Sequence, residues 1–183
     1  MTGFEALFAF YALLLGLAVA NVTSSFADMY RSRRHVRIGW TTPLLGVVIL
    51  LSVCHQWLAV FNAQELTLRA GEIIAMLTLA LPYIFISQAM TPRPGEAASL
   101  EEHYAGHRLV LAGMLLVPLL TSLVVNVVYL TVEHKWSGEE AIGLILYIGF
   151  RCAFVAAMLI WSATWVQRAG LSALGAYTLL LMI

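Results

Sequence analysis

The chain has 183 residues, of which 61% are hydrophobic and 11% are charged, and its ten basic and ten acidic side chains give a formal net charge of zero. Soluble domains carry about 25% charged residues, so this composition excludes a protein with a water-facing surface and predicts one surrounded by lipid. The balanced charge also excludes nucleic acid as a partner, because nucleic-acid-binding proteins carry an excess of basic residues.

Apolar stretches along the chain predict an all-α integral membrane protein that forms one compact domain. About 20 consecutive apolar residues cross a bilayer as a helix. The chain contains six candidate spans, at about 4–27, 41–61, 70–90, 109–131, 141–165 and 168–183. The sixth is short, because its residues rise only about 25 Å as a helix.

The loop RSRRHVR, residues 31–37, is the strongest signal for orientation. Short basic loops stay in the cytoplasm, so this loop is expected on the cytoplasmic side of a bacterial inner membrane, with both termini outside. Under that topology seven basic residues are inside and two are outside, which agrees with the positive-inside rule. The inside set is Arg31, Arg33, Arg34, Arg37, Arg93, Arg108 and Arg168, and the outside set is Arg69 and Lys135.

A polar loop, residues 91–99, precedes the fourth span, and Ser99 followed by Glu102 fits the capping box of a helix N-terminus. His103 and His107 follow four residues apart, so both lie on one helix face. That spacing can hold a divalent metal, but a third ligand would have to come from Glu102 or His35. The pair is a weak metal candidate, and no metal or cofactor is expected.

The fifth span contains Gly143–Trp165, an apolar run whose one full charge, Arg151, lies near the middle. An arginine at the centre of a bilayer costs about 2.5–3.5 kcal/mol on insertion scales. A chain that keeps arginine there requires a partner group, a water-filled cavity or both.

Helical rise places further polar side chains in the outer half of the membrane, near the depth of Arg151. His55, Gln56 and Asn126 lie about 8–9 Å below the outer boundary, and Arg151 lies about 15 Å below it but can extend outward. Tyr147 is one turn from Arg151 on the same helix face. The predicted ligand or ion pathway therefore comprises Arg151, His55, Gln56, Asn126, Tyr147 and the rim carboxylate Glu72.

Small residues four apart, at Gly149, Ala153 and Ala157, lie on the other side of the fifth helix from Arg151. Such a pattern lets a neighbouring helix approach closely, so we expect this face to be packed. Arg151 would then face either a structural partner, such as Glu72, Asn126 or a carbonyl freed near Pro82, or a wet cavity that attracts an anion.

Two classes of function fit these patterns. One is a small channel or transporter subunit for a small ion or solute, with a pH-responsive polar cavity around Arg151. Six short spans leave little room for a pathway in one protomer, so a homo-oligomer is expected. The other is an assembly subunit that binds membrane lipid or a partner protein without transport. No catalytic motif is visible, so an enzyme is not expected.

Overall fold

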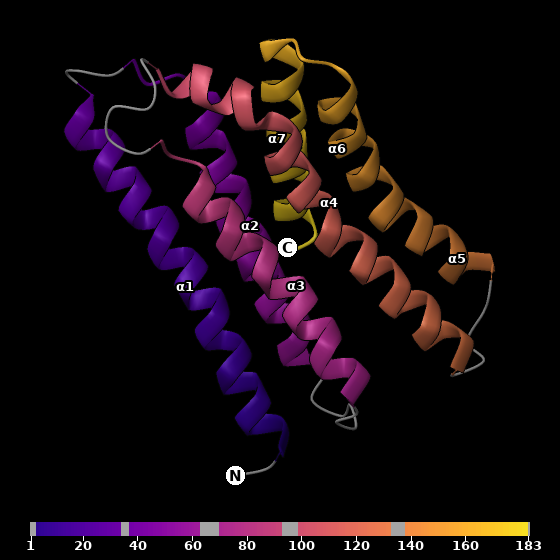
Figure 1. The fold of residues 1–183 in the computed structure, drawn as a ribbon. Helices are drawn as coiled ribbons and strands as arrows, with labels where there is room; N and C mark the ends of the chain where they lie inside the picture. Colours follow the sequence, from indigo (N-terminus) through magenta and orange to yellow (C-terminus); the bar gives the residue numbers. More distant parts are fainter. Residues whose placement is uncertain (1–2, 34–36, 63–69, 93–98, 133–137, 183) are drawn as a thin grey trace.

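The computed structural model describes residues 3–33, 37–62, 70–92, 99–132 and 138–182, and these are almost entirely helical (Figure 1). The first four helices are α1 (Gly3–Ser32), α2 (Thr41–Asn62), α3 (Ala70–Ala89) and α4 (Leu100–Val132). Then α5 (Gly138–Leu144), the π-helix η1 (Ile145–Gly149) and α6 (Phe150–Ile160) follow without a break. The last helix is α7 (Thr164–Leu180).

The six helical segments lie where the sequence predicts helices, with one clear correction at the fifth. The predicted span 141–165 ends too late, because helical structure stops at Ile160 and residues 161–163 form an extended connection. The polar residue Ser162 lies in this connection, and α7 starts at Thr164, four residues before the predicted 168. The predicted cap at the start of α4 is present, since the Glu102 backbone N–H donates to Ser99 Oγ at 3.2 Å.

Four helices are long and apolar enough to cross a membrane: Phe4–Ser32, Thr41–Phe61, Leu100–Val132 and Ile142–Ile160. The apolar part of α3, Ile73–Ala89, is shorter. A helix as long as α4 measures about 50 Å, which exceeds the ~30 Å hydrocarbon core, so its first turns extend beyond the apolar segment 109–131.

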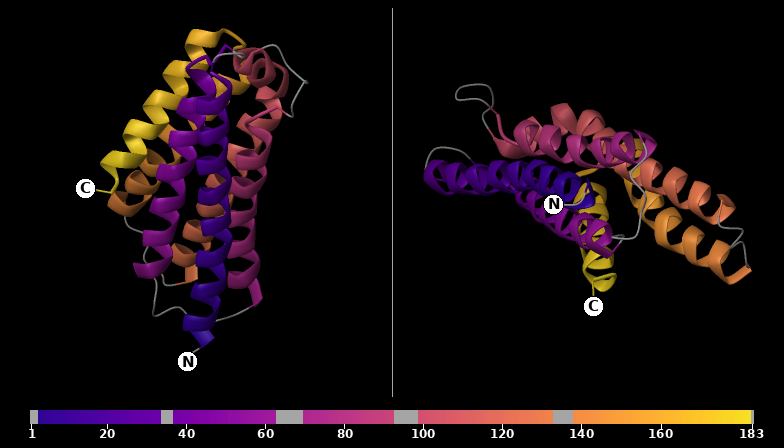
Figure 2. Two further views of the ribbon diagram at one scale, coloured as in Figure 1. Left: turned by 90° about the vertical axis from the view of Figure 1, so that its left-hand side faces the viewer. Right: turned by 90° about the horizontal axis from the view of Figure 1, so that it is seen from below.

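The helices pack as a layer of α1, α2 and α3 joined to a second group that contains α4 and α6. α1 packs on α2 and α3, α3 packs on α4, and α7 fills the space between α2 and α6. Figure 2 shows that the lower part of α4 and α5 project to one side, away from α1. The buried core runs along the contacts of the two groups, with Leu15, Ile49, Ile86, Leu111 and Leu171 among its fully buried side chains.

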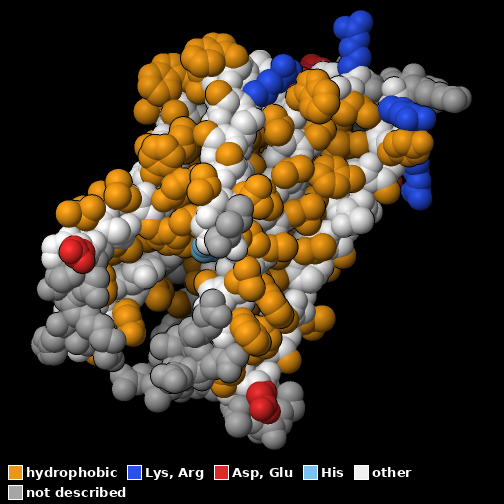
Figure 3. Space-filling view, turned by 180° about the vertical axis from the view of Figure 1, so that it is seen from behind, with side chains coloured by type: hydrophobic (Ala, Val, Ile, Leu, Met, Phe, Trp, Pro, Cys, Tyr) orange, Lys and Arg blue, Asp and Glu red, His pale blue; other side chains and the backbone are white. Residues whose placement is uncertain are grey.

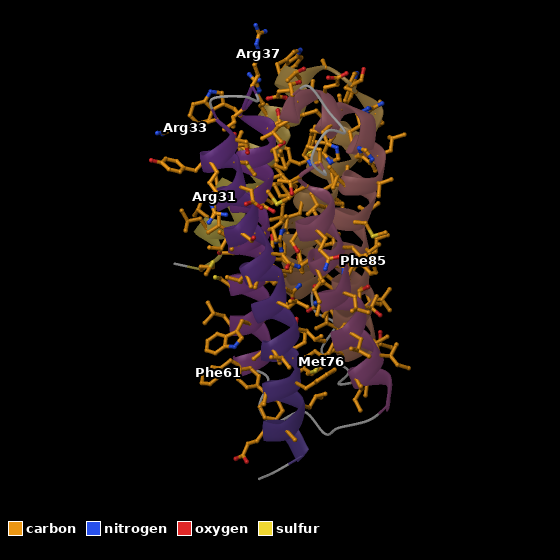
Figure 4. All side chains as sticks on the ribbon, turned by 60° about the vertical axis from the view of Figure 1, so that its left-hand side comes forward. Arg31, Arg33, Arg37, Phe61, Met76 and Phe85 are labelled. Atoms are coloured by element: carbon orange, nitrogen blue, oxygen red, sulfur yellow. The ribbon has the colours of Figure 1, made fainter. Side chains whose placement is uncertain are left out.

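Most of the surface of the bundle is apolar, as Figure 3 shows for one face. Apart from Arg151, the described arginines gather at one end, and Figure 4 shows Arg31, Arg33 and Arg37 there, with Phe61 at the opposite end. Phe85 points outward from α3. An apolar wall with arginines at one end is the surface that a lipid bilayer requires.

A hydrogen-bonded ion pair ties three helix N-termini together at this arginine-rich end. The Glu101 carboxylate accepts from the Thr41 hydroxyl at 2.7 Å, from the Thr41 N–H at 3.2 Å and from the Arg168 guanidinium at 2.9 Å. Partial burial opposes the ionisation of Glu101, but hydrogen bonds from Thr41 and Arg168 outweigh it and lower the pKa of this carboxyl, which precedes the apolar segment of α4. The pair joins α2, α4 and α7.

We expect Glu101→Gln to lower the stability of the protein in detergent at pH 7 by about 1 kcal/mol, because the charged acceptor is lost from a half-exposed pair. A carboxyl whose pKa is lower in the folded state contributes stability above its unfolded pKa and loses it as the pH falls. Thermal unfolding should therefore show that the difference between wild type and Glu101→Gln shrinks between about pH 5 and pH 3.

Glu102→Gln is the matched control for this prediction, because Glu102 is the exposed neighbour of Glu101. Its unfolding temperature should equal that of wild type at pH 7 and at pH 3. A constant gap between wild type and Glu101→Gln down to pH 3 would contradict the role given to the charge.

Candidate functional site

The candidate site is centred on Arg151, whose side chain is only 4% exposed. It lies nine residues before the end of α6 at Ile160, about 14 Å along the helix axis, so it is far from both helix ends. Its Nη2 donates to the Thr178 hydroxyl of α7 at 3.1 Å, and that hydroxyl donates to the Leu174 carbonyl at 2.8 Å. Thr178 is fully buried.

Two rings continue the site from Arg151 towards α2. The guanidinium carbon of Arg151 lies 5.7 Å from the centre of the Tyr147 ring, which is within the range of a cation–π contact. The Tyr147 hydroxyl is 3.4 Å from His55 Nε2, and the two rings are stacked with centroids 5.9 Å apart. The other ring nitrogen of His55, Nδ1, is buried and has no hydrogen-bond partner in the described part of the chain. We call Arg151, Thr178, Tyr147 and His55 the Arg151 cluster.

A second row of polar side chains lies beside the Arg151 cluster. Tyr83 of α3 is 2% exposed and makes side-chain hydrogen bonds with Ser52 and Gln56 of α2. Tyr11 of α1 is also buried, and its hydroxyl has no hydrogen-bond partner among the residues that the structure describes. Buried polar groups are normally hydrogen-bonded, so each unpartnered atom in this region carries a desolvation cost.

The structure brings together some of the predicted site residues and separates others. Arg151, Tyr147 and His55 contact one another, and Gln56 joins through Tyr83. Asn126 instead donates to its own helix, to the Ser122 carbonyl at 2.8 Å. The side chain of Glu72 is outside the described residues.

The expected packing of the fifth segment is reversed. Gly149 and Ala153 are exposed and Ala157 is half-buried, whereas Arg151, Val155 and Met158 form the buried face. The small-residue pattern predicted close helix packing on the wrong side, because it cannot distinguish a neighbour in the same chain from lipid or a second copy. Sequence reasoning also missed Thr178, Tyr83 and Ser52, since each is an ordinary residue in an apolar stretch and only its neighbours reveal it.

His103 and His107 do lie together, with ring centroids 4.4 Å apart, but each has one ring nitrogen hydrogen-bonded to a backbone carbonyl. His103 Nε2 donates to Ala89 at 2.9 Å, and His107 Nδ1 donates to His103 at 3.0 Å. Within the described ranges there is no group of three or more potential metal ligands, and His35 falls outside them. These contacts tie α4 to the end of α3.

A second polar junction holds the connection between α6 and α7. Gln167, 2% exposed, donates to the carbonyls of Met158 and Trp161, both at 2.7 Å, and accepts from the Tyr104 hydroxyl at 2.9 Å. Arg108 donates to the Met158 and Leu159 carbonyls at 3.3 and 3.1 Å. The Met158 and Leu159 carbonyls in the last turn of α6, which have no partner within the helix, thus accept hydrogen bonds from α4 and α7.

In chemical terms, the Arg151 cluster offers a permanent positive charge, hydroxyl groups and an imidazole ring. A guanidinium, hydroxyl groups and an imidazole are groups that bind anions and polar solutes through hydrogen bonds. The chain matches no protein-family model, no curated protein sequence and no solved structure.

Proposed function

We propose that the protein is a small integral membrane channel or transporter subunit whose permeation path passes the Arg151 cluster. The observation that carries this proposal is the burial of Arg151 far from both ends of a bundle with an apolar surface. Ionisable residues at such positions are costly, and in membrane proteins they mark ion and substrate pathways. Four helices long and apolar enough to cross a bilayer support the membrane setting.

We propose an orientation in which the loop of residues 31–37 is on the cytoplasmic side of a bacterial inner membrane, the N-terminus is outside and α7 runs towards the outside. The arginines at one end of the bundle support it, because basic residues favour the cytoplasmic side. The space-filling view is hollowed at the end opposite the arginines, which would let solute approach from the outer side (Figure 3). Exposed small residues on α1, at Gly16, Ala20 and Ser24, favour association of copies into a homo-oligomer.

The direct test is flux in liposomes that contain the purified protein. We expect the protein to raise the permeability to a small ion or solute above that of liposomes with an unrelated membrane protein of similar size. A panel of potassium, chloride, acetate and glycerol gradients covers cations, anions and neutral solutes. Permeability equal to the control for the whole panel would contradict a transport function.

We further expect this flux to depend on pH on the acidic side, between about pH 4 and 6, through His55, because its half-buried position and the fixed charge of Arg151 both oppose protonation of the imidazole. His55→Gln keeps a polar side chain but cannot titrate, so its flux should vary less than twofold over this range. His107→Gln, at the arginine-rich end, is the matched control and should keep the wild-type profile. An unchanged profile in His55→Gln would remove His55 from the mechanism.

The second candidate is an assembly subunit that binds lipid or a partner membrane protein without transport. It is favoured by an apolar groove of about 370 Å³ between α1 and α2, whose lining includes Gly16, Cys54 and Trp57. A groove of this kind fits an acyl chain or a helix. Co-purified lipid that is lost on Gly16→Leu, in a protein that supports no flux, would favour this candidate.

A further inference from the structure

The positive charge of Arg151 has no negative partner among the described residues. The five carboxylates that the structure describes all lie near helix ends. They are Glu5 at the start of α1, Asp28 at the end of α1, Glu101 and Glu102 in the first turn of α4, and Glu139 in the first turn of α5. Arginine stays protonated in proteins, so burial cannot remove its charge. An uncompensated buried ion costs several kcal/mol, and within the described part of the chain this charge has no counter-ion.

The donors of Arg151 are also incompletely used. Its Nε–H is buried and has no hydrogen-bond partner among the described residues, although Nη2 reaches Thr178. A buried donor without an acceptor carries its full desolvation cost. Other groups near the guanidinium that take part in its electrostatics are Tyr83 of α3, Tyr147 of η1, His55 of α2 and Cys152 of α6. None of these is an anion at neutral pH in its ordinary state.

The neighbouring groups are suited to an anion as well. The Tyr147 hydroxyl can donate a hydrogen bond, and His55 Nδ1, buried and unpartnered, can do so when it carries a proton. The positive charge of a protonated His55 would be repelled by Arg151. An anion bound between the two side chains would attract both. Binding of an anion and protonation of His55 should therefore strengthen each other.

We propose that the Arg151 cluster binds an anion, with Arg151 as the charged anchor and Tyr147 and His55 as further donors. The inference rests on the proposed function and names its substrate class. The same chemistry could come from a free small anion, such as chloride or a short carboxylate, or from the phosphate of a lipid headgroup. Both present a compact negative charge to a guanidinium fork.

The test is thermal unfolding of the delipidated protein in neutral detergent at constant ionic strength. Sodium chloride, nitrate or acetate replaces sodium gluconate, whose large hydroxylated anion is the reference. A ligand at about 100 times its Kd should raise the Tm of wild type by about 5 °C. Arg151→Gln should lose this rise, and Thr178→Val should need about 10-fold more anion, because the guanidinium is no longer held by the hydroxyl.

Arg108→Gln is the matched control, since it also removes one arginine, but from the carbonyl junction at the end of α6. Its Tm should be lower in gluconate, yet the rise with anion should remain. Arg151→Lys keeps the charge and should keep a weakened rise, so it tests the proposal even if Arg151→Gln does not fold.

A second arm separates the two sources of the anion. Dioctanoyl phosphatidylglycerol, added in place of salt, should raise the Tm in an Arg151-dependent way if a lipid headgroup is the ligand, whereas dioctanoyl phosphatidylcholine should not. If neither anions nor the anionic lipid shift wild type, or if Arg151→Gln shifts equally, the anion site is wrong. Selective potassium flux in liposomes together with no anion effect would overturn this inference while leaving the proposed transport function standing.

Discussion

Arg151→Gln is expected to abolish flux through the protein in liposomes, by at least 100-fold, while leaving a folded protein in detergent. The glutamine keeps a hydrogen-bonding side chain of moderate length, so it can still reach Thr178, but it carries no charge. If Arg151 recruits the permeating species by charge, the loss of about 3 kcal/mol of attraction corresponds to this fold-change. Flux of the species identified for wild type, measured at several protein-to-lipid ratios, checks it.

The stability of the same variant decides between the two roles of Arg151. If Arg151 is only a structural tie, Arg151→Gln loses one charged hydrogen bond and unfolds at lower temperature, yet the protein that folds conducts normally. If Arg151 binds the permeating species, removal of a buried charge that has no counter-ion among the described residues leaves stability in gluconate equal to wild type or higher. Arg108→Gln provides the opposite pattern, because it should lower stability and leave flux intact.

Gln167→Ala is expected to destabilise the protein by about 3 kcal/mol, the largest effect on folding among the variants considered. It removes two hydrogen bonds to carbonyls at the end of α6 and leaves the buried Tyr104 hydroxyl without its acceptor. Each unsatisfied buried polar group costs about 1–3 kcal/mol. Thermal or denaturant unfolding in detergent should show a clear loss of stability at pH 7.

Tyr104→Phe is the matched variant for Gln167. It removes only the hydroxyl that donates to Gln167, so the glutamine keeps both of its bonds to α6 and stability should fall by about 1 kcal/mol. In the Gln167→Ala background the same change should cost little, because the hydroxyl is already unsatisfied. Equal and additive losses from the two changes would contradict the coupling.

The helical character and the order of the segments follow from apolar runs, so composition and length predict them well. The end of the fifth segment cannot be predicted in this way, because Trp161, Ala163 and Trp165 are as apolar as the helix before them. What stops α6 is the carbonyl capping by Gln167 and Arg108, residues from other helices. Tertiary contacts of this kind carry no local signal in the sequence.

The candidate site could be predicted from the sequence only in part. A charge in an apolar run is visible in the sequence, and helical spacing correctly linked Tyr147 with Arg151. Depth in the membrane predicted that His55 and Asn126 lie near the level of Arg151. It carries no information about which face of each helix points towards Arg151. Only His55 contacts Tyr147, whereas Asn126 bonds to Ser122, because the facing of α4 is set by its packing on α3 and α6.

The π-helical turn η1 sets the rotational phase between α5 and Arg151. A π turn holds one more residue than an α turn, which rotates the segment before it by about 100° relative to the segment after it. The exposed face of Ile142, Ile145 and Leu146 is therefore out of phase with the buried face of Arg151, Val155 and Met158. Removal of one residue from Ile145–Gly149 would restore a continuous α-helix. Either Tyr147 would then turn away from the Arg151 cluster, or the exposed side chains of α5 would turn away from the surface.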